Sequence, residues 1–341
     1  MIRIRDIAEI CGVSTATVSN VIHKKYNKVS PALREKIEYE LSKNGYVPNQ
    51  SALMLAQTRT DIIGVVAGDR KKDAFNLEDP YFSKMFRYLE QNISSCSKYM
   101  MMLIDKPYEE VLRQAARWNF DGMILLNLGQ KQLHGITGSY TKPIVTIDSP
   151  FEYDCSTISQ LRTDDYGGGY RMGEYFAELG HTDVAMLADN DVSVDHFRWQ
   201  GFVDGLREHH VVIDEKAHII IDKTDHSESD ESEEYERHFE KLRAKSAVFC
   251  ASDYYARSLT HFMIDKGLRV PEDISIAGFD DLLFAKLCRP KLTTIHQDIK
   301  LKAKIAVDHL NRLIDGEKVE GRVVVPVRLM ERNSVILHKK N

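Results

Sequence analysis

Several features that mark other classes of protein are missing from this sequence of 341 residues. No apolar run approaches the roughly 20 residues that a membrane-spanning helix needs. The N-terminus, MIRIRDIAEI, carries arginines and acids where a secretory signal would carry an apolar core. We therefore expect a cytoplasmic protein with no membrane partner.

Cysteine is scarce and scattered, and the short motifs of common enzymes are absent. The odd number of cysteines and the lack of a CxxC pair favour reduced thiols over a disulfide framework or a zinc site. HExxH and GxSxG do not occur, and the glycine run at 167–169 lacks the spacing and the lysine of a phosphate-binding loop. The sequence thus predicts no enzyme activity, no metal and no other cofactor. The five cysteines are Cys11, Cys96, Cys155, Cys250 and Cys288.

The composition is that of an ordinary globular protein, but its charge is unevenly distributed. Hydrophobic residues make up 43% and charged residues 28%, and the length suffices for two or three domains. Residues 1–60 hold nine Lys/Arg and five Asp/Glu, whereas the rest of the chain is acidic. A basic head on an acidic body indicates an anionic partner for the head, although a chance asymmetry would give the same count.

The head carries the pattern of a helix-turn-helix. In RDIAEICGVSTATVSNVIHKK, residues 5–25, apolar residues recur at helical spacing on both sides of Gly12. Glycine suits the positive φ of a tight turn, and Ser14 is a good N-cap for the second helix. A third helix is predicted from Ser30-Pro31 to Asn44-Gly45.

The second helix begins with small polar residues, as a helix that enters a major groove requires. The Asn20 amide suits adenine, and the Thr15 methyl group suits thymine. A structural three-helix bundle with a hydroxyl-rich surface remains the alternative. The predicted DNA contacts of this head are Ser14, Thr15, Ala16, Thr17, Ser19, Asn20 and His23.

From end to end the sequence resembles the LacI/GalR family of bacterial transcriptional regulators. IRDIAEICGVSTATVSNVIH is similar to the family pattern IxDVAxxAGVSxxTVSRVLN, and VSPALREKIEYELSKNGYVPN to VSEETREKVLEAIEELGYRPN. DIIGVVAGD, FDGMILLN, ELGHTDVAML, RWQGFVDGL, RVPEDISIAGFDD and PKLTTIHQDI follow in the family's order. Two departures stand out: Asn20 replaces the family's usual arginine, and Ser252 replaces its common asparagine.

The resemblance implies a hinge helix over Gln50 to Gln57, within a linker at 49–60. So short a helix is marginal in water, so it should order only beside its dimer mate in a DNA minor groove. Ala52 is small enough for close approach of the two helices, and Leu55 stands where the family places a leucine wedge that kinks the duplex. The alternative for Leu55 is packing on the body.

The body alternates short β-rich runs with amphipathic helical stretches, which predicts parallel sheets. Together with the resemblance, this gives a small all-α helix-turn-helix head and an α/β, two-lobed, periplasmic-binding-protein-like core. We expect the head at 1–48 and the core at 61–341, with chain crossings between its lobes near 159–162, 290–293 and 321–323. The lobes are then 61–160 with 293–321, and 161–292 with 322–341.

Ligands of open α/β sheets bind beyond the carboxyl ends of the strands. The candidate effector residues stand at such ends or open the helices that follow: Tyr81, Phe82, Asp148, Arg198, Ser252 and Asp280. Phe82 and Trp199 are equally well explained as core residues. Asp253 and Asp281 are better explained as helix caps.

Together these features predict a regulator, a repressor, that binds a palindromic double-stranded DNA operator as a homodimer. A small-molecule effector, a carbohydrate, would control it through lobe closure. A sugar-binding receptor of the same fold without a transcriptional role is the main alternative, and a degenerate enzyme on this scaffold is a second.

Overall fold

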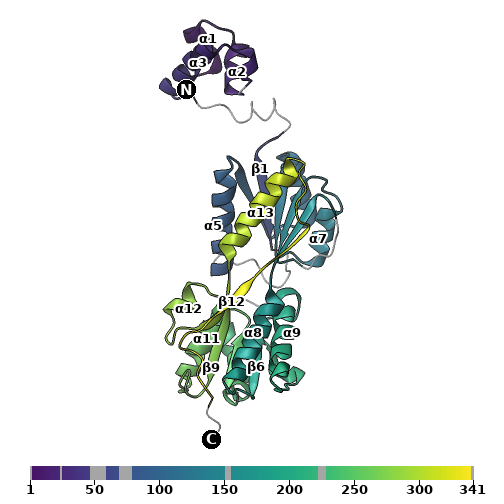
Figure 1. The fold of residues 1–341 in the computed structure, drawn as a ribbon, viewed down its shortest axis with the longest axis vertical. Coiled ribbons are helices and arrows are strands. Elements are labelled where there is room, and N and C mark those ends of the chain that lie inside the picture. Colours follow the sequence, from purple (N-terminus) through teal and green to yellow (C-terminus); the bar gives the residue numbers. More distant parts are fainter. Residues whose placement is uncertain are drawn as a thin grey trace. The chain divides into compact units, whose positions relative to one another are not determined.

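The computed structural model describes residues 2–23, 25–46, 59–68, 79–149, 155–221 and 228–338. The chain forms two compact units, Met1–Thr60 and Asp61–Asn341 (Figure 1). The predicted hinge helix, with Ala52 and Leu55, lies outside the described residues.

The first unit is the three-helix head that the sequence predicts. Its helices are α1 (Ile4–Cys11), α2 (Thr15–Ile22) and α3 (Pro31–Lys43), with a 3-10 turn η1 (Tyr26–Lys28). Gly12 ends α1 with φ +70°, and the Ser14 side chain accepts a hydrogen bond from the Thr17 amide at 3.1 Å. Both predictions for the turn are confirmed. The small core is formed by Ile7, Ala8, Cys11, Val18, Val21 and Ile37.

Two six-stranded sheets form the second unit. The first sheet is wholly parallel, because each of its strand pairs has parallel register. Along the sheet, its strands are β11 (Arg322–Val325), β5 (Ile158–Thr163), β4 (Ile144–Ile147), β3 (Gly122–Leu126), β1 (Ile62–Ala67) and β2 (Tyr99–Ile104).

The second sheet is parallel except at one edge, where β12 runs antiparallel to β10. In order, its strands are β12 (Val327–Met330), β10 (Thr293–Gln297), β9 (Ser275–Asp280), β8 (Ala247–Cys250), β6 (Val184–Ala188) and β7 (His218–Ile220).

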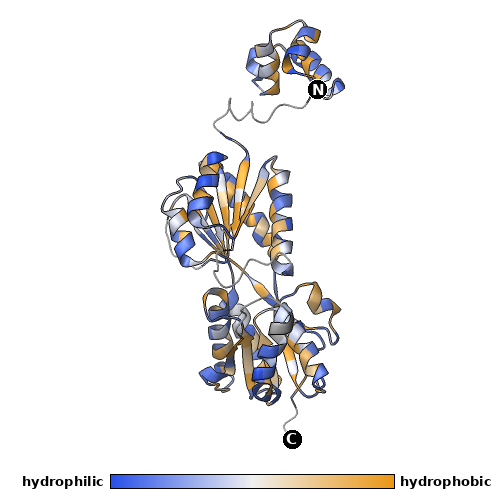
Figure 2. Ribbon diagram, turned by 180° about the vertical axis from the view of Figure 1, so that it is seen from behind, coloured by the Kyte–Doolittle hydropathy of each residue, from blue (hydrophilic) through white to orange (hydrophobic). Residues whose placement is uncertain are grey.

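Helices cover both sheets, and the central strands are apolar along their length (Figure 2). Alternate residues of β6 enter different cores: Ala185 and Leu187 join one cluster, and Val184 and Met186 join the other.

The helices are α5 (Pro80–Ser95), α6 (Tyr108–Arg117), α7 (Gln130–Thr137), α8 (Asp165–Glu178), α9 (Ser193–Glu208), α10 (Glu228–Arg243), α11 (Asp253–Asp265), α12 (Leu283–Leu287) and α13 (Ile299–Ile314), with a 3-10 turn η2 (Glu215–Ala217). None of these described helices is long and apolar enough to cross a membrane.

The chain crosses between the sheets three times, each time a few residues later than the sequence prediction. Strand β10 therefore belongs to the second sheet and β11 to the first, which corrects the predicted lobe boundaries. Asp164 follows β5 and caps α8, and Asp298 follows β10 and caps α13. Pro326 separates β11 from β12, because proline cannot continue a ladder of backbone hydrogen bonds. The strands thus run to their carboxyl ends before the chain changes lobe.

Close packing of α8 on α9 accounts for several glycines, including the last one of the run at 167–169. A Cβ on Gly169 would lie 2.0 Å from the Arg198 carbonyl oxygen, and one on Gly201 would lie 2.0 Å from that of Tyr166. These glycines let the two backbones touch, and they fix the start of α9 against the start of α8. The other two glycines of the run face the Asp164 carboxylate and the Phe279 ring, so the run as a whole serves close packing.

Replacing Gly201 with alanine should lower the free energy of unfolding by about 3 kcal/mol, because a backbone oxygen cannot move aside for the new Cβ. The matched control is Gly321→Ala, since nothing lies within 4 Å of a Cβ at that position. Urea unfolding of both variants checks the prediction. Equal losses in the two variants would contradict the packing argument.

Candidate functional site

The first turn of α2 is the most exposed polar surface of that helix. Ser14, Thr15 and Ala16 are exposed, while Thr17 is partly buried. The Ser14 and Thr17 hydroxyl oxygens lie 2.9 Å apart, so these two side chains hold the turn together. Thr15 and Ala16 are therefore the residues most available to an outside partner.

One turn further along α2, the predicted DNA contacts are partly buried. Ser19, Asn20 and His23 all have intermediate exposure. The backbone oxygen of Asn20 accepts a hydrogen bond from the Lys25 amide at 2.8 Å, which fixes the end of the helix. Below them, Val18 and Val21 turn into the core of the head. The helix thus has one apolar side and one polar side, as a recognition helix requires.

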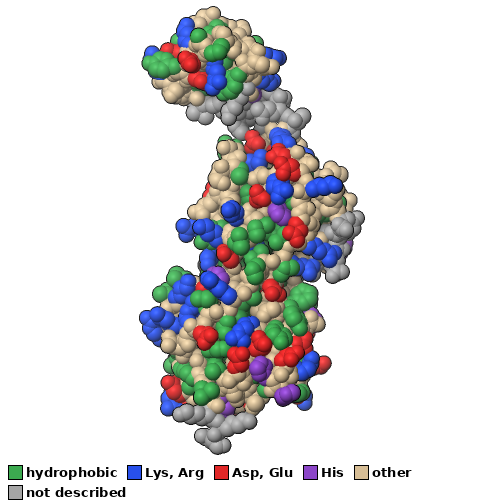
Figure 3. All heavy atoms as spheres, viewed as in Figure 1, with side chains coloured by type: hydrophobic (Ala, Val, Ile, Leu, Met, Phe, Trp, Pro, Cys, Tyr) green, Lys and Arg blue, Asp and Glu red, His purple; other side chains and the backbone are tan. Residues whose placement is uncertain are grey.

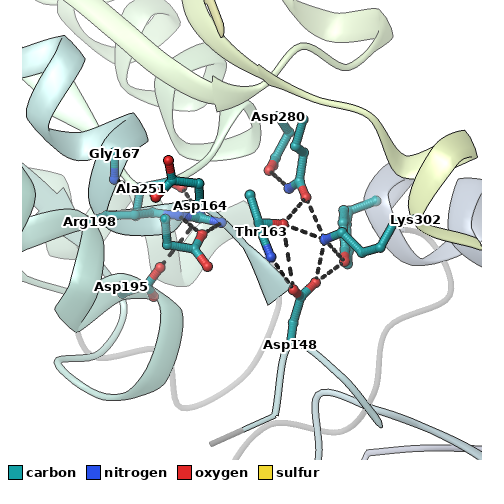
Figure 4. A network of polar contacts seen from close by, with 12 residues as sticks. Asp148, Thr163, Asp164, Gly167, Asp195, Arg198, Ala251, Asp280 and Lys302 are labelled. Atoms are coloured by element: carbon teal, nitrogen blue, oxygen red, sulfur yellow. Dashed lines mark hydrogen bonds and ion pairs between the residues drawn. The ribbon is translucent and has the colours of Figure 1, made fainter. Parts of the chain in front are cut away.

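In the body, polar side chains meet where strands of both sheets end. Asp148 follows β4 and Thr163 ends β5 in the first sheet, whereas Asp280 ends β9 and Gln297 ends β10 in the second. Asp148 has φ 49° and Asp280 has φ 109°. Positive φ is costly for a residue other than glycine, and such strain is concentrated at functional sites. Figure 4 shows the resulting network.

Lys302 is the centre of one half of this network. It lies on the first turn of α13, and its side chain is fully buried. The ammonium nitrogen lies 2.6 Å from Asp148 Oδ2 and 2.8 Å from Gln297 Oε1, and it also donates to Thr163 Oγ1. Tyr81 donates its hydroxyl hydrogen to the same Asp148 oxygen at 2.5 Å. A buried ion pair is thus surrounded by neutral hydrogen-bonding groups.

Gln297 connects this half of the network to the second sheet. Its amide nitrogen donates to Asp280 Oδ1 at 2.5 Å, and its amide oxygen accepts from Thr163 Oγ1 at 2.9 Å. Because Thr163 and Gln297 come from different sheets, the two lobes share a continuous set of hydrogen bonds next to two of the chain crossings.

Arg198 is the centre of the other half. Its guanidinium nitrogens Nε and Nη2 lie 2.9 and 2.8 Å from Asp165 Oδ1, and Nη1 donates to the Ala251 carbonyl oxygen at 2.6 Å. Asp195 lies 3.7 Å away on the same helix. The guanidinium carbon lies 3.7 Å from the centre of the Phe279 ring, within the range of a cation–π contact. Arg198 is thus buried, and two carboxylates and an aromatic ring hold its guanidinium group in place.

Burial sets the protonation of these carboxyl groups. It raises the pKa of Asp165 to about 6 and that of Asp280 to about 7, although Arg198 acts in the opposite direction on both. The pKa of Asp195 is also raised well above its usual value by burial. Burial acts to raise the pKa of Asp148 as well, but the Lys302 ammonium outweighs it, so that this pKa is lowered.

The arrangement of these groups suits the binding of a small molecule more than catalysis. It offers hydrogen-bond donors and acceptors from both lobes, and a hydroxyl-rich molecule can use both kinds. Among the described residues, no group of three or more His, Cys, Asp or Glu side chains is placed to hold a metal ion.

Comparison with known proteins identifies the family. Residues 3–49 match the family model described as bacterial regulatory proteins, lacI family, and residues 174–335 match the periplasmic binding protein-like domain. The transcriptional repressor PurR of Photorhabdus laumondii is 31% identical over 98% of this chain and 97% of its own length. The chain belongs to the LacI family of transcriptional regulators.

Related proteins and solved structures match this chain along almost its whole length. The regulator GalR of Escherichia coli is 29% identical over 98% of this chain and 96% of its own. A structure of the Lac repressor bound to ONPG in the repressed state matches 98% of this chain and 99% of that one, with 25% identity and a TM-score of 0.77. A complex of the regulator CelR with cellobiose matches 98% of this chain and 100% of that one, with 25% identity and a TM-score of 0.70. The predicted fold class is confirmed.

Four of the six predicted effector residues meet in the polar network of this LacI-family body. Tyr81 and Asp148 contact Lys302, Asp280 contacts Gln297, and Arg198 lies beside Asp165. These contacts leave the predicted roles in effector binding untested, and the roles of Arg198 and Asp280 are taken up as proposals below.

The other two predicted effector residues have structural roles. Ser252 is the N-cap of α11 and accepts from the Tyr255 amide at 3.4 Å, a role that the sequence analysis gave to Asp253. Phe82 packs against the core of the first lobe.

Asp253 and Asp281 are not helix caps. Asp253 accepts from the Leu282 amide at 2.7 Å and the Thr294 hydroxyl at 2.6 Å, which ties α11 to two neighbouring segments. Asp281 pairs with Arg332 at 2.5 Å. Both predictions failed because the partners come from distant parts of the chain.

The sequence analysis missed the residues that complete the network, namely Thr163, Asp165, Asp195, Gln297 and Lys302. One signal was present. In IKLKAKIAVDHL, Lys302 falls on the apolar stripe of the helix, beside Ala303 and Ala306. A lysine on the buried face of an amphipathic helix indicates a buried partner.

The stability of the protein should depend on pH through Asp280. The native protein keeps the Asp280 proton up to about pH 7, whereas an unfolded chain releases it near pH 4. Since the native state binds the extra proton in this window, this contribution to stability falls as the pH rises from about 4 to about 7. The slope is at most about 1.4 kcal/mol per pH unit.

Urea unfolding across this pH range should therefore show a smaller loss of stability in Asp280→Asn than in the unchanged protein. The matched control is Asp308→Asn, because Asp308 is exposed on α13. If the unchanged protein and Asp280→Asn gave parallel pH profiles, Asp280 would have no raised pKa.

Proposed function

We propose that this LacI-family chain represses transcription by binding a palindromic operator as a homodimer. A small-molecule effector, a sugar or a sugar derivative, binds between the two lobes and changes the affinity for DNA. The observation that carries the proposal is the presence, in one chain, of a slender polar helix start in the head and a buried polar network between the lobes of the body.

The head supports the DNA-binding half of the proposal. Its basic charge favours an anionic partner, and the exposed Thr15 and Ala16 leave the start of α2 narrow enough for a major groove. The Asn20 amide can donate to and accept from adenine. On the face of the body seen in Figure 3, acidic and basic side chains are interspersed. The head is therefore the better DNA-binding surface.

A homodimer follows from the symmetry of a palindrome. Two heads, held one helical turn of DNA apart, read the two half-sites in the same way. The predicted hinge segments, with Ala52 and Leu55, would then meet in the minor groove between the half-sites. A structure of the Lac repressor dimer bound to operator and an anti-inducer, 24% identical to this chain, supports a dimer on an operator.

The body supports the part of the proposal that concerns the small-molecule effector. Asp195 and Arg198 lie in the first two turns of α9, and Asp280 ends β9 of the second lobe, where Gln297 links it to Thr163 of the first. Sugar hydroxyls can donate to the carboxylates and accept from the guanidinium. The related regulator CelR was solved as a complex with cellobiose, which is a sugar. An effector that binds both lobes favours their closed arrangement, and it changes DNA affinity only by its preference for that arrangement.

Two other functions have less support. A transport receptor has no use for a helix-turn-helix head, and the matched relatives are named as regulators or repressors. Those names also argue against the degenerate enzyme.

Selection of bound sequences from a random duplex library should return inverted repeats, because a symmetric dimer presents two identical heads. Affinity for the selected duplex, measured by fluorescence anisotropy, should fall steeply as salt is raised, since phosphate contacts release counterions. Asn20→Ala should weaken binding to that duplex by about tenfold, the cost of one lost base contact.

The matched control is Ser42→Ala, which removes an exposed polar group from α3 and should leave affinity unchanged. A monomeric protein that selects no symmetric sequence would contradict the proposal.

The same assay tests the effector. Adding sugars one at a time, including cellobiose, galactose and ribose, should reveal at least one that changes the affinity for the selected duplex. Arg198→Met should abolish that response without changing DNA binding in the absence of sugar. If a sugar acted equally on Arg198→Met, the effector would bind elsewhere.

A further inference from the structure

Asp148 and Tyr81 lie at a strand end and a helix start that face the second lobe, where a ligand would be expected, yet both already have a partner. The partner is the side chain of Lys302. An ammonium group has three hydrogens to donate. Asp148, Gln297 and Thr163 are its nearest acceptors, and the Tyr81 hydroxyl oxygen lies at 3.4 Å. Lys302 thus resembles a ligand that is covalently tethered to the protein.

The surroundings of the ammonium group make it a permanent feature of the site. The Lys302 side chain has no exposed surface, and Asp148 is only 8% exposed. The accepting groups come from β4, β5 and β10, that is, from both sheets. Neighbouring lysines on the same helix, Lys300 and Lys304, are exposed and take no part.

We propose that Lys302 is a specificity-determining residue whose ammonium group permanently occupies one subsite of the inter-lobe site. The occupied subsite is bounded by Tyr81, Asp148, Thr163 and Gln297. The effector is therefore confined to the remaining part, beside Arg198 and Asp280. This consequence for the effector rests on the proposed function, whereas the occupancy of the subsite does not.

The proposal restricts what the effector can be. Asp148, which the sequence analysis offered as an effector contact, is not available to it. Asp280 accepts a hydrogen bond from Gln297 through Oδ1, so the effector would engage its other oxygen, Oδ2. A compact molecule held by Arg198 and Asp280 fits this reduced site better than one that needs the carboxylates of both lobes.

Removing the lysine side chain should create a binding site for a small primary amine. Lys302→Ala deletes three carbons and the ammonium group, which together are propylammonium. We expect propylammonium to raise the melting temperature of purified full-length Lys302→Ala saturably, by about 2–4 °C when the amine is in tenfold excess over its dissociation constant. The unchanged protein should show no such rise.

Two controls separate the subsite from general effects of the amine. Propan-1-ol has the same chain without the charge and should give no saturable rise. The double variant Lys302→Ala with Asp148→Asn lacks the carboxylate and should lose the response. An equal rise in the double variant, or no rise in the single variant, would overturn the proposal.

A measurement on the unchanged protein covers the case in which Lys302→Ala does not fold. Acetylation with an amine-reactive ester, followed by peptide mass spectrometry, compares Lys302 with Lys300 and Lys304 in one molecule. Lys302 should react at least a hundredfold more slowly than its two neighbours. Reaction at a similar rate would show that the ammonium leaves the subsite readily, and would overturn the proposal.

The outcomes also separate this inference from the proposed function. If the protein selects no operator but Lys302 is protected from acetylation, the subsite assignment holds and the regulatory role fails. If an operator is selected but Lys302 reacts like its neighbours, the regulatory role holds and the subsite assignment fails.

Discussion

The compensation of buried charge between the two lobes is the constraint on which the rest of the body depends. The two sheets bring Asp148, Asp165 and Asp280 to one buried region, where uncompensated carboxylates would be costly. Lys302 pairs with Asp148, and Arg198 pairs with Asp165. Around the first pair, hydrogen bonds of Thr163 and Gln297 come from both sheets, so the region that holds the lobes together is also the region available to a ligand.

The packing around the network serves this compensation. Glycines let α8 and α9 touch, which places Asp165 at the start of α8 beside Arg198 in the second turn of α9. Strained backbone at Asp148 and Asp280 turns their carboxylates toward the junction. Such strain persists only where the surrounding structure enforces it. An effector that engages Asp280 therefore acts on a group that is linked through Gln297 to Thr163 of the first lobe, which gives a direct physical route from binding to lobe movement.

Local features of the fold could be predicted from the sequence because their causes are local. Gly12 and Ser14 define the turn of the head through backbone preference and capping, and buried strands such as β3 are continuous apolar runs. The crossings were placed too early because a strand end and a change of lobe look alike in sequence. What distinguishes them is the aspartate cap of the next helix, at Asp164 and Asp298.

The site was only partly predictable, for a different reason. Arg198 and Asp280 stand at strand or helix ends, which the general rule for α/β sheets identifies. Lys302 stands within the first turn of a helix of the first lobe, and its partners are up to 221 residues away in the chain. No local sequence pattern identifies those partners, although a lysine on the apolar side of a helix indicates that a buried partner exists.

The most direct test of charge compensation is a double-mutant cycle on the Lys302–Asp148 pair, measured by urea unfolding. The variants are Asp148→Asn, Lys302→Met and the combination of the two. Removing one partner leaves a buried charge unpaired, so each single variant should lose about 3 kcal/mol or more, and the double variant should lose less than the two losses together. A coupling energy of about 2 kcal/mol or more is the predicted result. Strictly additive losses would contradict the account, because they would mean that the two charges do not hold each other in place.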